Sequence, residues 1–60
     1  IMPVIAQKDG KMGLLLPDGK DTVVADFVYD DISLRDEPPY FEVRKGRTKG
    51  YIDNQGNFTK

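Results

Sequence analysis

Short runs of β-branched and aromatic residues alternate along this chain with clusters of Gly, Pro and Asp. Gly or Pro interrupts every window long enough for a helix, and in a helix interior each Gly costs about 1 kcal/mol and each Pro about 3 kcal/mol. The pattern is therefore typical of strands joined by turns. We predict an all-β fold of antiparallel hairpins, forming a small meander or an open barrel-like sheet. The expected strands lie near residues 3–8, 12–16, 22–25, 27–34, 40–45, 49–53 and 57–60.

The turns between these strands have recognisable residues. Asp9-Gly10 and Lys45-Gly46 each stand between two strand-like runs, where a two-residue type I′ hairpin needs residues that tolerate positive φ. Longer Gly-containing turns are expected at residues 16–19 and 53–56. In the second of these, the side chain of Asp53 is expected to accept hydrogen bonds from backbone N–H groups inside the turn.

The apolar positions of the expected strands predict the core, and the segment 36–39, with two prolines and two acids, breaks the strand pattern. The expected core residues are Val4, Leu14, Leu15, Val23, Phe27, Tyr29, Ile32, Phe41, Val43, Tyr51, Ile52 and Phe58.

The chain also matches itself. Residues 6–11 align with 42–47 at an offset of 36, and residues 12–15 align with 49–52 at an offset of 37 when Thr48 is counted as an insertion. Because a fixed period in this range is the signature of repeat proteins, we interpret the chain as an internal repeat. Residues 1–60 then form one small β-repeat domain, with approximate units 1–37 and 38–60, the second truncated.

The repeated residues resemble the WG β-repeat family, which occurs in arrays in many bacterial proteins. Its unit typically reads Gly-Lys-Trp-Gly, two apolar residues, Asp, a short turn with Gly, apolar residues, and Tyr-Asp-Asp-Ile. Residues 49–58 match this unit almost throughout, 13–15 and 18–20 match the first copy, and 29–32 match the final signature. The resemblance implies a β-rich repeat without an established general activity, thought to mediate interactions.

The Trp that helps to name the family is absent from both copies, where Met12 and Lys49 stand in its place. If the family's Trp lies in the core, Met12 can replace it as a flexible filler. Lys49 can do so only by laying its methylene groups along the surface. If the Trp contacts a ligand, that contact is lost in this chain.

Composition narrows the function classes. The 60 residues include no Cys and no His, so the chain has no disulfide and lacks the commonest transition-metal ligand. A net charge of −1 argues against a dominant role in nucleic-acid binding. The longest apolar stretch is too short to span a bilayer, and we expect no membrane insertion. Because the chain begins at Ile1 without a signal peptide, we expect it to belong to a longer protein, whose compartment the composition does not indicate.

No group of residues predicts chemistry. Ser33 is the single Ser, and no His is present to activate it. Asp30 and Asp31 are adjacent, so on a strand they point to opposite faces; we expect one to cap a turn and the other to face water. The oxygen-rich segment 53–57 is not followed by the Glu that an EF-hand loop requires. We therefore predict no enzyme activity, no catalytic or metal-binding residues and no cofactor.

The charge distribution and the aromatic residues suggest one surface. Residues 18–37 carry a net charge of −5, from seven acids and two bases, whereas residues 41–60 carry +3, from five bases and two acids. Tyr40 and Phe41 lie next to this basic part of the chain and, being adjacent, point in opposite directions. The candidate partner-binding surface comprises Tyr40, Phe41, Arg44, Lys45, Arg47 and Lys49.

These observations leave three functions open. The first is a non-catalytic module that mediates protein interaction or repeat stacking, with a protein partner, neighbouring repeats or a second copy of itself. The second is an accessory module that binds a peptide or glycan and is appended to an enzyme. The third is a purely structural spacer. An exposed aromatic cleft favours the second, whereas apolar surface at the sheet ends favours stacking.

Overall fold

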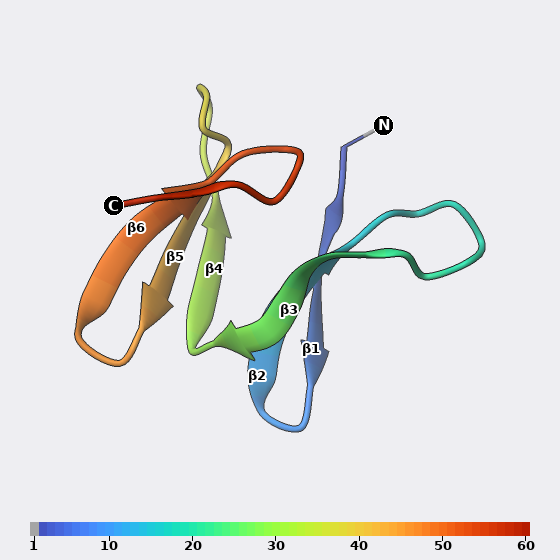
Figure 1. The fold of residues 1–60 in the computed structure, drawn as a ribbon, viewed down its shortest axis with the longest axis horizontal. Coiled ribbons are helices and arrows are strands. Elements are labelled where there is room, and N and C mark those ends of the chain that lie inside the picture. Colours follow the sequence, from blue (N-terminus) through green and yellow to red (C-terminus); the bar gives the residue numbers. More distant parts are fainter. Residues whose placement is uncertain (1) are drawn as a thin grey trace.

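The computed structural model describes residues 2–60 and confirms the all-β prediction (Figure 1). All neighbouring strands are antiparallel, and they form one sheet in the order β1-β2-β3 and another in the order β4-β5-β6-β7. No helix that could span a membrane is found in the described part of the chain. The strands are β1 (Val4–Lys8), β2 (Lys11–Leu15), β3 (Val23–Tyr29), β4 (Asp31–Leu34), β5 (Phe41–Lys45), β6 (Thr48–Ile52) and β7 (Phe58–Thr59).

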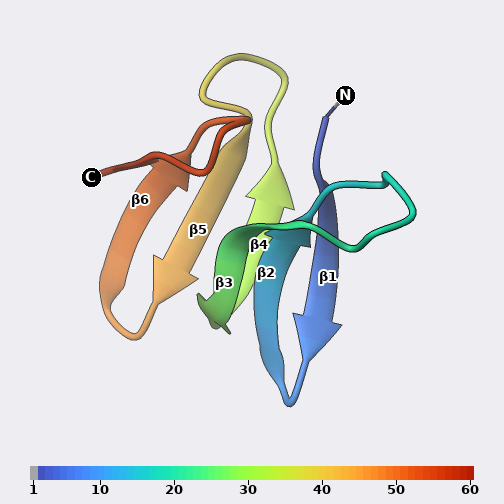
Figure 2. The same ribbon diagram turned by 45° about the vertical axis from the view of Figure 1, so that its right-hand side comes forward.

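One strand boundary differs from the prediction. We expected separate strands at 22–25 and 27–34, but β3 runs without interruption from Val23 to Tyr29 and the chain bends at Asp30. Figures 1 and 2 show β3 passing from the first sheet toward the second, where it continues as β4. The chain therefore passes from the first sheet to the second at this bend. The Asp30 carboxylate stabilises the bend by accepting hydrogen bonds.

The first hairpin (β1–β2) has the predicted turn, since Asp9 and Gly10 have φ values of 53° and 82°. The second hairpin (β5–β6) turns one residue later than predicted. Lys45 pairs with Thr48, so the turn residues are Gly46 and Arg47, and Gly46 has a φ of 61°. A Gly-first turn of this kind leaves Lys45 on the strand and free of a positive φ.

The two hairpins have the same register. Val4 pairs with Leu15 and Phe41 pairs with Ile52, which differ by 37 at both positions (41 − 4 and 52 − 15). The same offset relates all five residue pairs of β1–β2 to the five of β5–β6. The predicted offset of 36 and the insertion at Thr48 were therefore wrong. They rested on aligning Gly10 with Gly46, but Gly10 is the second residue of its turn and Gly46 is the first residue of its own.

In each sheet the last strand passes close to a glycine at the same register position. A Cβ atom on Gly13 would lie 2.7 Å from the carbonyl oxygen of Ala25 in β3. A Cβ atom on Gly50 would lie 2.9 Å from the carbonyl oxygen of Thr59 in β7 and would collide with the ring of Phe58. Both positions therefore require glycine for close backbone approach, not for a special φ.

Both sheets contribute to one hydrophobic cluster, and five of its six buried residues were predicted. Ala25 was missed, because a small side chain between Val24 and the charged Asp26 gives little apolar signal. Four predicted core residues, Leu15, Phe27, Tyr29 and Tyr51, are only partly buried. The buried residues are Leu14, Ala25, Ile32, Phe41, Val43 and Ile52.

Three predicted core residues are instead exposed. Val4, Val23 and Phe58 retain 46%, 50% and 47% of their accessible surface. Phe58 belongs to a two-residue strand at a sheet edge, and Val23 is the first residue of β3. Val4 lies on a hairpin face against which no other sheet packs, and that face is central to the candidate site.

Candidate interaction surfaces

Each hairpin presents two faces, which alternate along its strands. We call the faces that contain Leu14 and Tyr51 the front faces, and the opposite ones the rear faces; paired residues share a face. The front faces comprise Ile5, Gln7, Met12 and Leu14 in the first hairpin and Glu42, Arg44, Lys49 and Tyr51 in the second. The rear faces comprise Val4, Ala6, Gly13 and Leu15 in the first hairpin and Phe41, Val43, Gly50 and Ile52 in the second.

The front face of the first hairpin packs against the rear face of the second. Leu14, with no exposed surface, lies in one cluster with Phe41 and Val43. The sulfur of Met12 accepts a hydrogen bond from the Ile32 N–H at 3.3 Å. Met12 therefore fills a contact between β2 of the first sheet and β4 of the second, at the position where the resembled family has Trp.

The rear face of the first hairpin is apolar and is open at Val4, whereas Ala6 and Leu15 are half-buried and Gly13 is buried beneath β3. Val4 is 46% exposed, whereas Phe41, its counterpart 37 residues later, is 1% exposed. Val4 also borders an apolar hollow of about 340 Å³, which Ile5 of the front face and Leu34 and Phe41 of the second sheet line as well. The hollow is lined by Met2, Pro3, Val4, Ile5, Leu34 and Phe41.

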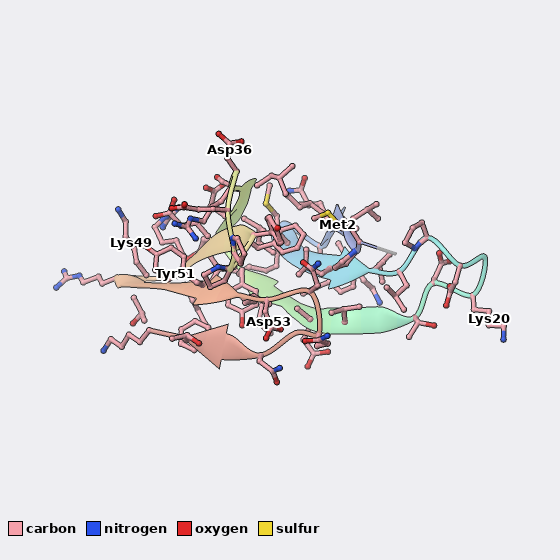
Figure 3. The ribbon with its side chains drawn as sticks, turned by 90° about the horizontal axis from the view of Figure 1, so that it is seen from above. Met2, Lys20, Asp36, Lys49, Tyr51 and Asp53 are labelled. Atoms are coloured by element: carbon pink, nitrogen blue, oxygen red, sulfur yellow. The ribbon has the colours of Figure 1, made fainter. Side chains whose placement is uncertain are left out.

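The front face of the second hairpin is polar. Lys49 is exposed at the position equivalent to Met12, and Tyr51 is half-buried at the position equivalent to the fully buried Leu14. The guanidinium of Arg35 lies 4.7 Å from the centre of the Tyr51 ring, a cation–π distance that covers part of the ring. Figure 3 shows Lys49 and Tyr51 at the end of the molecule opposite the loop that carries Lys20.

Asp30 joins the turns of the two hairpins. Its carboxylate accepts hydrogen bonds from the Lys11 ammonium and from the Gly46 N–H (2.7 Å), and Arg44 lies 3.8 Å away. The Lys11 hydrogen bond, and then that of Gly46, lower the pKa of the Asp30 carboxyl. Asp31 is exposed, so the interpretation of this pair as one turn cap and one solvated acid is confirmed.

Two further aspartates organise the longer turns. Asp18 accepts from the Thr22 hydroxyl (2.8 Å) and the Lys20 N–H (2.9 Å), which lower its pKa in that order. Asp53 accepts from the Asn57 N–H at 2.9 Å, the strongest cause of its own lowered pKa, and from the Gln55 N–H. The expected side-chain-to-backbone bonds of Asp53 are therefore confirmed.

The candidate partner surface does not form one patch. Phe41 is a core residue with 1% exposure, so its assignment to the surface was wrong; the strand alternation turned it toward the interior. Tyr40 is half-buried and packs against the core. Arg44 and Lys49 are register partners on the front face of the second hairpin, and Arg47 lies at its exposed turn.

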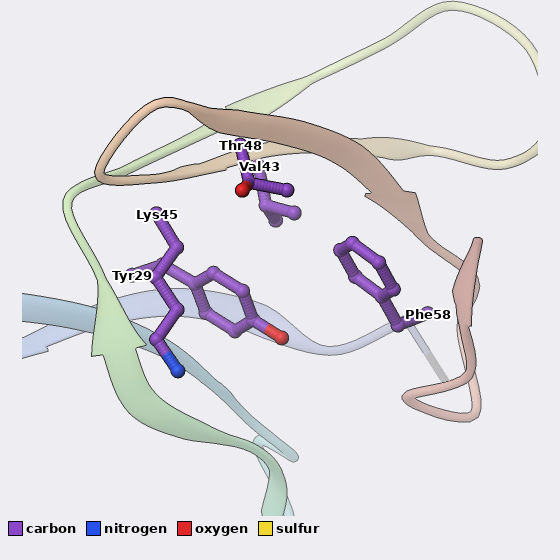
Figure 4. Close-up of a pocket in the computed structure, with 5 residues that line it drawn as sticks. All are labelled: Tyr29, Val43, Lys45, Thr48 and Phe58. Carbon is purple, nitrogen blue, oxygen red and sulfur yellow. The ribbon is translucent and has the colours of Figure 1, made fainter. Parts of the chain in front are cut away.

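Lys45 lies on the opposite face from Arg44 and lines a hollow of about 260 Å³ between the end of β3 and the second sheet (Figure 4). In Figure 4, Tyr29 faces Val43 and Thr48 across this hollow. Its volume falls below the 300 to 1,000 Å³ typical of sites for drug-sized ligands. The apolar hollow beside Val4 is larger. The sequence analysis missed it, because the alignment misplaced the 37-residue register that relates Val4 to Phe41.

No protein-family model, curated protein or solved structure matches this chain.

Proposed function

We propose that this chain is a non-catalytic β-repeat module that works by packing its apolar rear face against a neighbouring unit. The unit belongs to the same polypeptide or to a protein partner, in line with the resemblance to the WG β-repeat family. The observation that carries the proposal is the shared register. Two hairpins 37 residues apart pack front to rear, and the equivalent rear face of the first hairpin stays exposed at Val4.

The front-to-rear contact is heterologous, because the two surfaces that meet differ from each other. A heterologous contact can be repeated along an array, with each unit covering the next. The rear face of the second hairpin shows what such cover does, since Phe41, Val43 and Ile52 are at most 2% exposed. The open Val4 rear face is the equivalent surface without its neighbour.

The polar front face of the second hairpin supports placing this hairpin at one end of the proposed array. Terminal repeats of solenoid proteins keep a polar outer face for solubility. Glu42, Arg44 and Lys49 give the second hairpin this character, whereas Met12 and Leu14 occupy the equivalent front face in the first. We therefore assign the second hairpin to a capping role, and the neighbour docks on the first.

An accessory peptide- or glycan-binding role has less support. Of the two aromatic residues that suggested it, Phe41 is buried and Tyr40 packs against the core. The stacking role instead uses the exposed Val4 side chain on the rear face, with the exposed Met2 and Leu34 lining the same hollow.

The test is sedimentation equilibrium of the 60-residue chain over a wide concentration range. Because the front of the second hairpin is polar, we expect a rear-to-rear dimer at high concentration and no larger polymer. Val4→Lys places a charge on the rear face and should shift the dimer to monomer. Val28→Lys is the matched control, since Val28 in β3 is 38% exposed and lies outside both faces; this variant should dimerise like the parent chain.

A parent chain that stays monomeric at millimolar concentration would contradict the proposal. Equal weakening by Val4→Lys and Val28→Lys would do the same, because it would place the association elsewhere. Thermal unfolding of each variant in the monomeric range separates lost association from lost folding.

A further inference from the structure

The outer edge of β1 is an unpaired strand edge. β1 is hydrogen-bonded to β2 alone, and its residues Val4 to Gln7 include neither a charge nor a Pro. Such an edge is open to pairing with another chain, and proteins usually protect it. Among the other edge strands of the described chain, β7 is two residues long, β3 carries the charged Asp26, and the outer edge of β4 meets the sulfur of Met12.

The second hairpin shows what occupies the equivalent edge. β5, which corresponds to β1 at the offset of 37, pairs with β6 on one side and with β4 on the other. β4 is antiparallel to β5, with Asp31 opposite Arg44 and Leu34 opposite Phe41. At the bend that precedes β4, the Asp30 N–H donates to the Arg44 carbonyl at 2.8 Å.

We propose that the β1 edge binds an extended strand with the residue pattern of β4, Asp-Ile-Ser-Leu, in an antiparallel orientation. Subtracting 37 from the β5 partners gives the register (44 − 37 = 7 and 41 − 37 = 4). The incoming Asp then lies opposite Gln7 and the incoming Leu opposite Val4. The inference rests on the proposed function, because the strand belongs to the neighbour that also covers the rear face.

Backbone geometry and apolar side chains select this strand. In β4, Ile32 and Leu34 point to the rear-face side of β5, opposite Val43 and Phe41. On β1 the equivalent partners are Ala6 and Val4, so the incoming Ile and Leu would extend the apolar rear face. Main-chain hydrogen bonds supply the rest of the affinity, as in other cases of strand addition.

The direction of each N–H group in β4 provides a sharp test. The Arg35 N–H donates to the Tyr40 carbonyl, whereas the Ile32 N–H points away from β5 to the Met12 sulfur. Because N–H directions alternate along a strand, the Ser33 N–H faces β5. In a bound peptide, the N–H at the Ser position should therefore face β1, and the N–H at the Ile position should face solvent.

The probe is a capped synthetic peptide with the sequence of residues 29–35, titrated into isotope-labelled chain at a concentration where the chain is monomeric. We expect saturable shifts of the Ile5 and Gln7 amide resonances, while those of Glu42 and Arg44, whose edge is occupied, stay in place. N-methylation at the Ser33 position should weaken binding about tenfold, as expected for loss of one main-chain hydrogen bond plus a steric clash. N-methylation at the Ile32 position should leave the affinity within about twofold, because no bond to β1 is lost.

A gain-of-function variant complements the peptides. Arg44 lies 3.8 Å from the Asp30 carboxylate, and the equivalent residue in the first hairpin is the neutral Gln7. Gln7→Arg should therefore tighten peptide binding severalfold. Gln55→Arg adds the same charge at an exposed turn of the second sheet and should leave the affinity unchanged.

Absence of shifts at Ile5 and Gln7 up to millimolar peptide would overturn the inference, as would equal binding of the two N-methylated peptides. The peptide carries a strand but no packed sheet, so it tests the edge alone. Rear-face dimerisation without peptide binding would leave the proposed function standing and remove the strand addition. Peptide binding by a chain that never dimerises would remove the rear-face packing and leave the edge site.

Discussion

The two hairpins of this chain have the same strand register but differ in which of their residues are buried. In the first, Leu14 on the front face is buried and Val4 on the rear face is exposed; in the second, Phe41 on the rear face is buried and Lys49 on the front face is exposed. Leu14 and Phe41 lie on opposite faces of their hairpins, yet both are at most 1% exposed. Burial here depends on which face has a neighbour, not on the position of a residue within its hairpin.

The largest expected difference is between Phe41 and Val4, which occupy the same register position. Phe41→Ala should cost about 3–5 kcal/mol, the usual cost of removing a buried aromatic ring. A chain of this length has a total stability of only about 3–9 kcal/mol, so much of the variant should be unfolded at room temperature. Val4→Ala should cost less than about 1 kcal/mol, because nearly half of Val4 is already in water.

Urea unfolding followed by circular dichroism, at a concentration where the chain is monomeric, measures both values. Similar losses for the two variants would show that Val4 is covered in solution and that the hairpins are not as different as the structure shows.

A reciprocal exchange of Met12 and Lys49, which occupy the same register position in the two hairpins, should have the next largest effect. Met12→Lys removes the sulfur that accepts the Ile32 N–H and should cost about 1–3 kcal/mol, the cost of an unsatisfied buried donor. Lys49→Met should change monomer stability by less than about 0.5 kcal/mol, because Lys49 is exposed. It should also promote front-to-rear polymers in place of the rear-to-rear dimer, since it makes the capping face more apolar.

Unfolding curves give the two stabilities, and sedimentation velocity gives the size of the assemblies. Met12→Leu is the control for shape, because it keeps the apolar volume and removes only the sulfur. A Lys49→Met chain that stays no larger than the parent dimer would count against the capping role of the second hairpin.

The sequence was sufficient for the fold class, the hairpins and most of the buried core. Strand and turn residues act locally, and the Asp9-Gly10 turn follows from the φ preferences of those two residues alone. The second turn was misplaced by one residue, because Gly46 suits either position of a two-residue turn. Only the pairing of Lys45 with Thr48 decides between them.

The candidate site was less predictable, because its properties arise between the hairpins. Alternation predicted that Tyr40 and Phe41 point in opposite directions, but it did not indicate which face would be covered. Val4 and Phe41 are both apolar strand residues, and only the front-to-rear packing makes one of them core and the other surface. The one-residue error in the repeat offset concealed this equivalence.

The smallest expected effect concerns Asp30, which ties the turns of the two hairpins together. Its pKa is lowered in the folded chain by the Lys11 and Gly46 hydrogen bonds. Its contribution to stability is therefore present above the pKa of an unfolded Asp, about 3.9, and is lost as the pH falls through the lower folded value. Asp30→Asn should lower the thermal midpoint by a few degrees at pH 7 and by less at pH 2, where the parent carboxyl is itself protonated.

Thermal melts at both pH values test this prediction. The control is Asp36→Asn, which removes the same charge from an exposed position in the loop 35–40. An Asp30→Asn loss that is equal at pH 7 and pH 2 would show that the side chain holds the bend by its shape and neutral hydrogen bonds, and that the charge does not couple the hairpins.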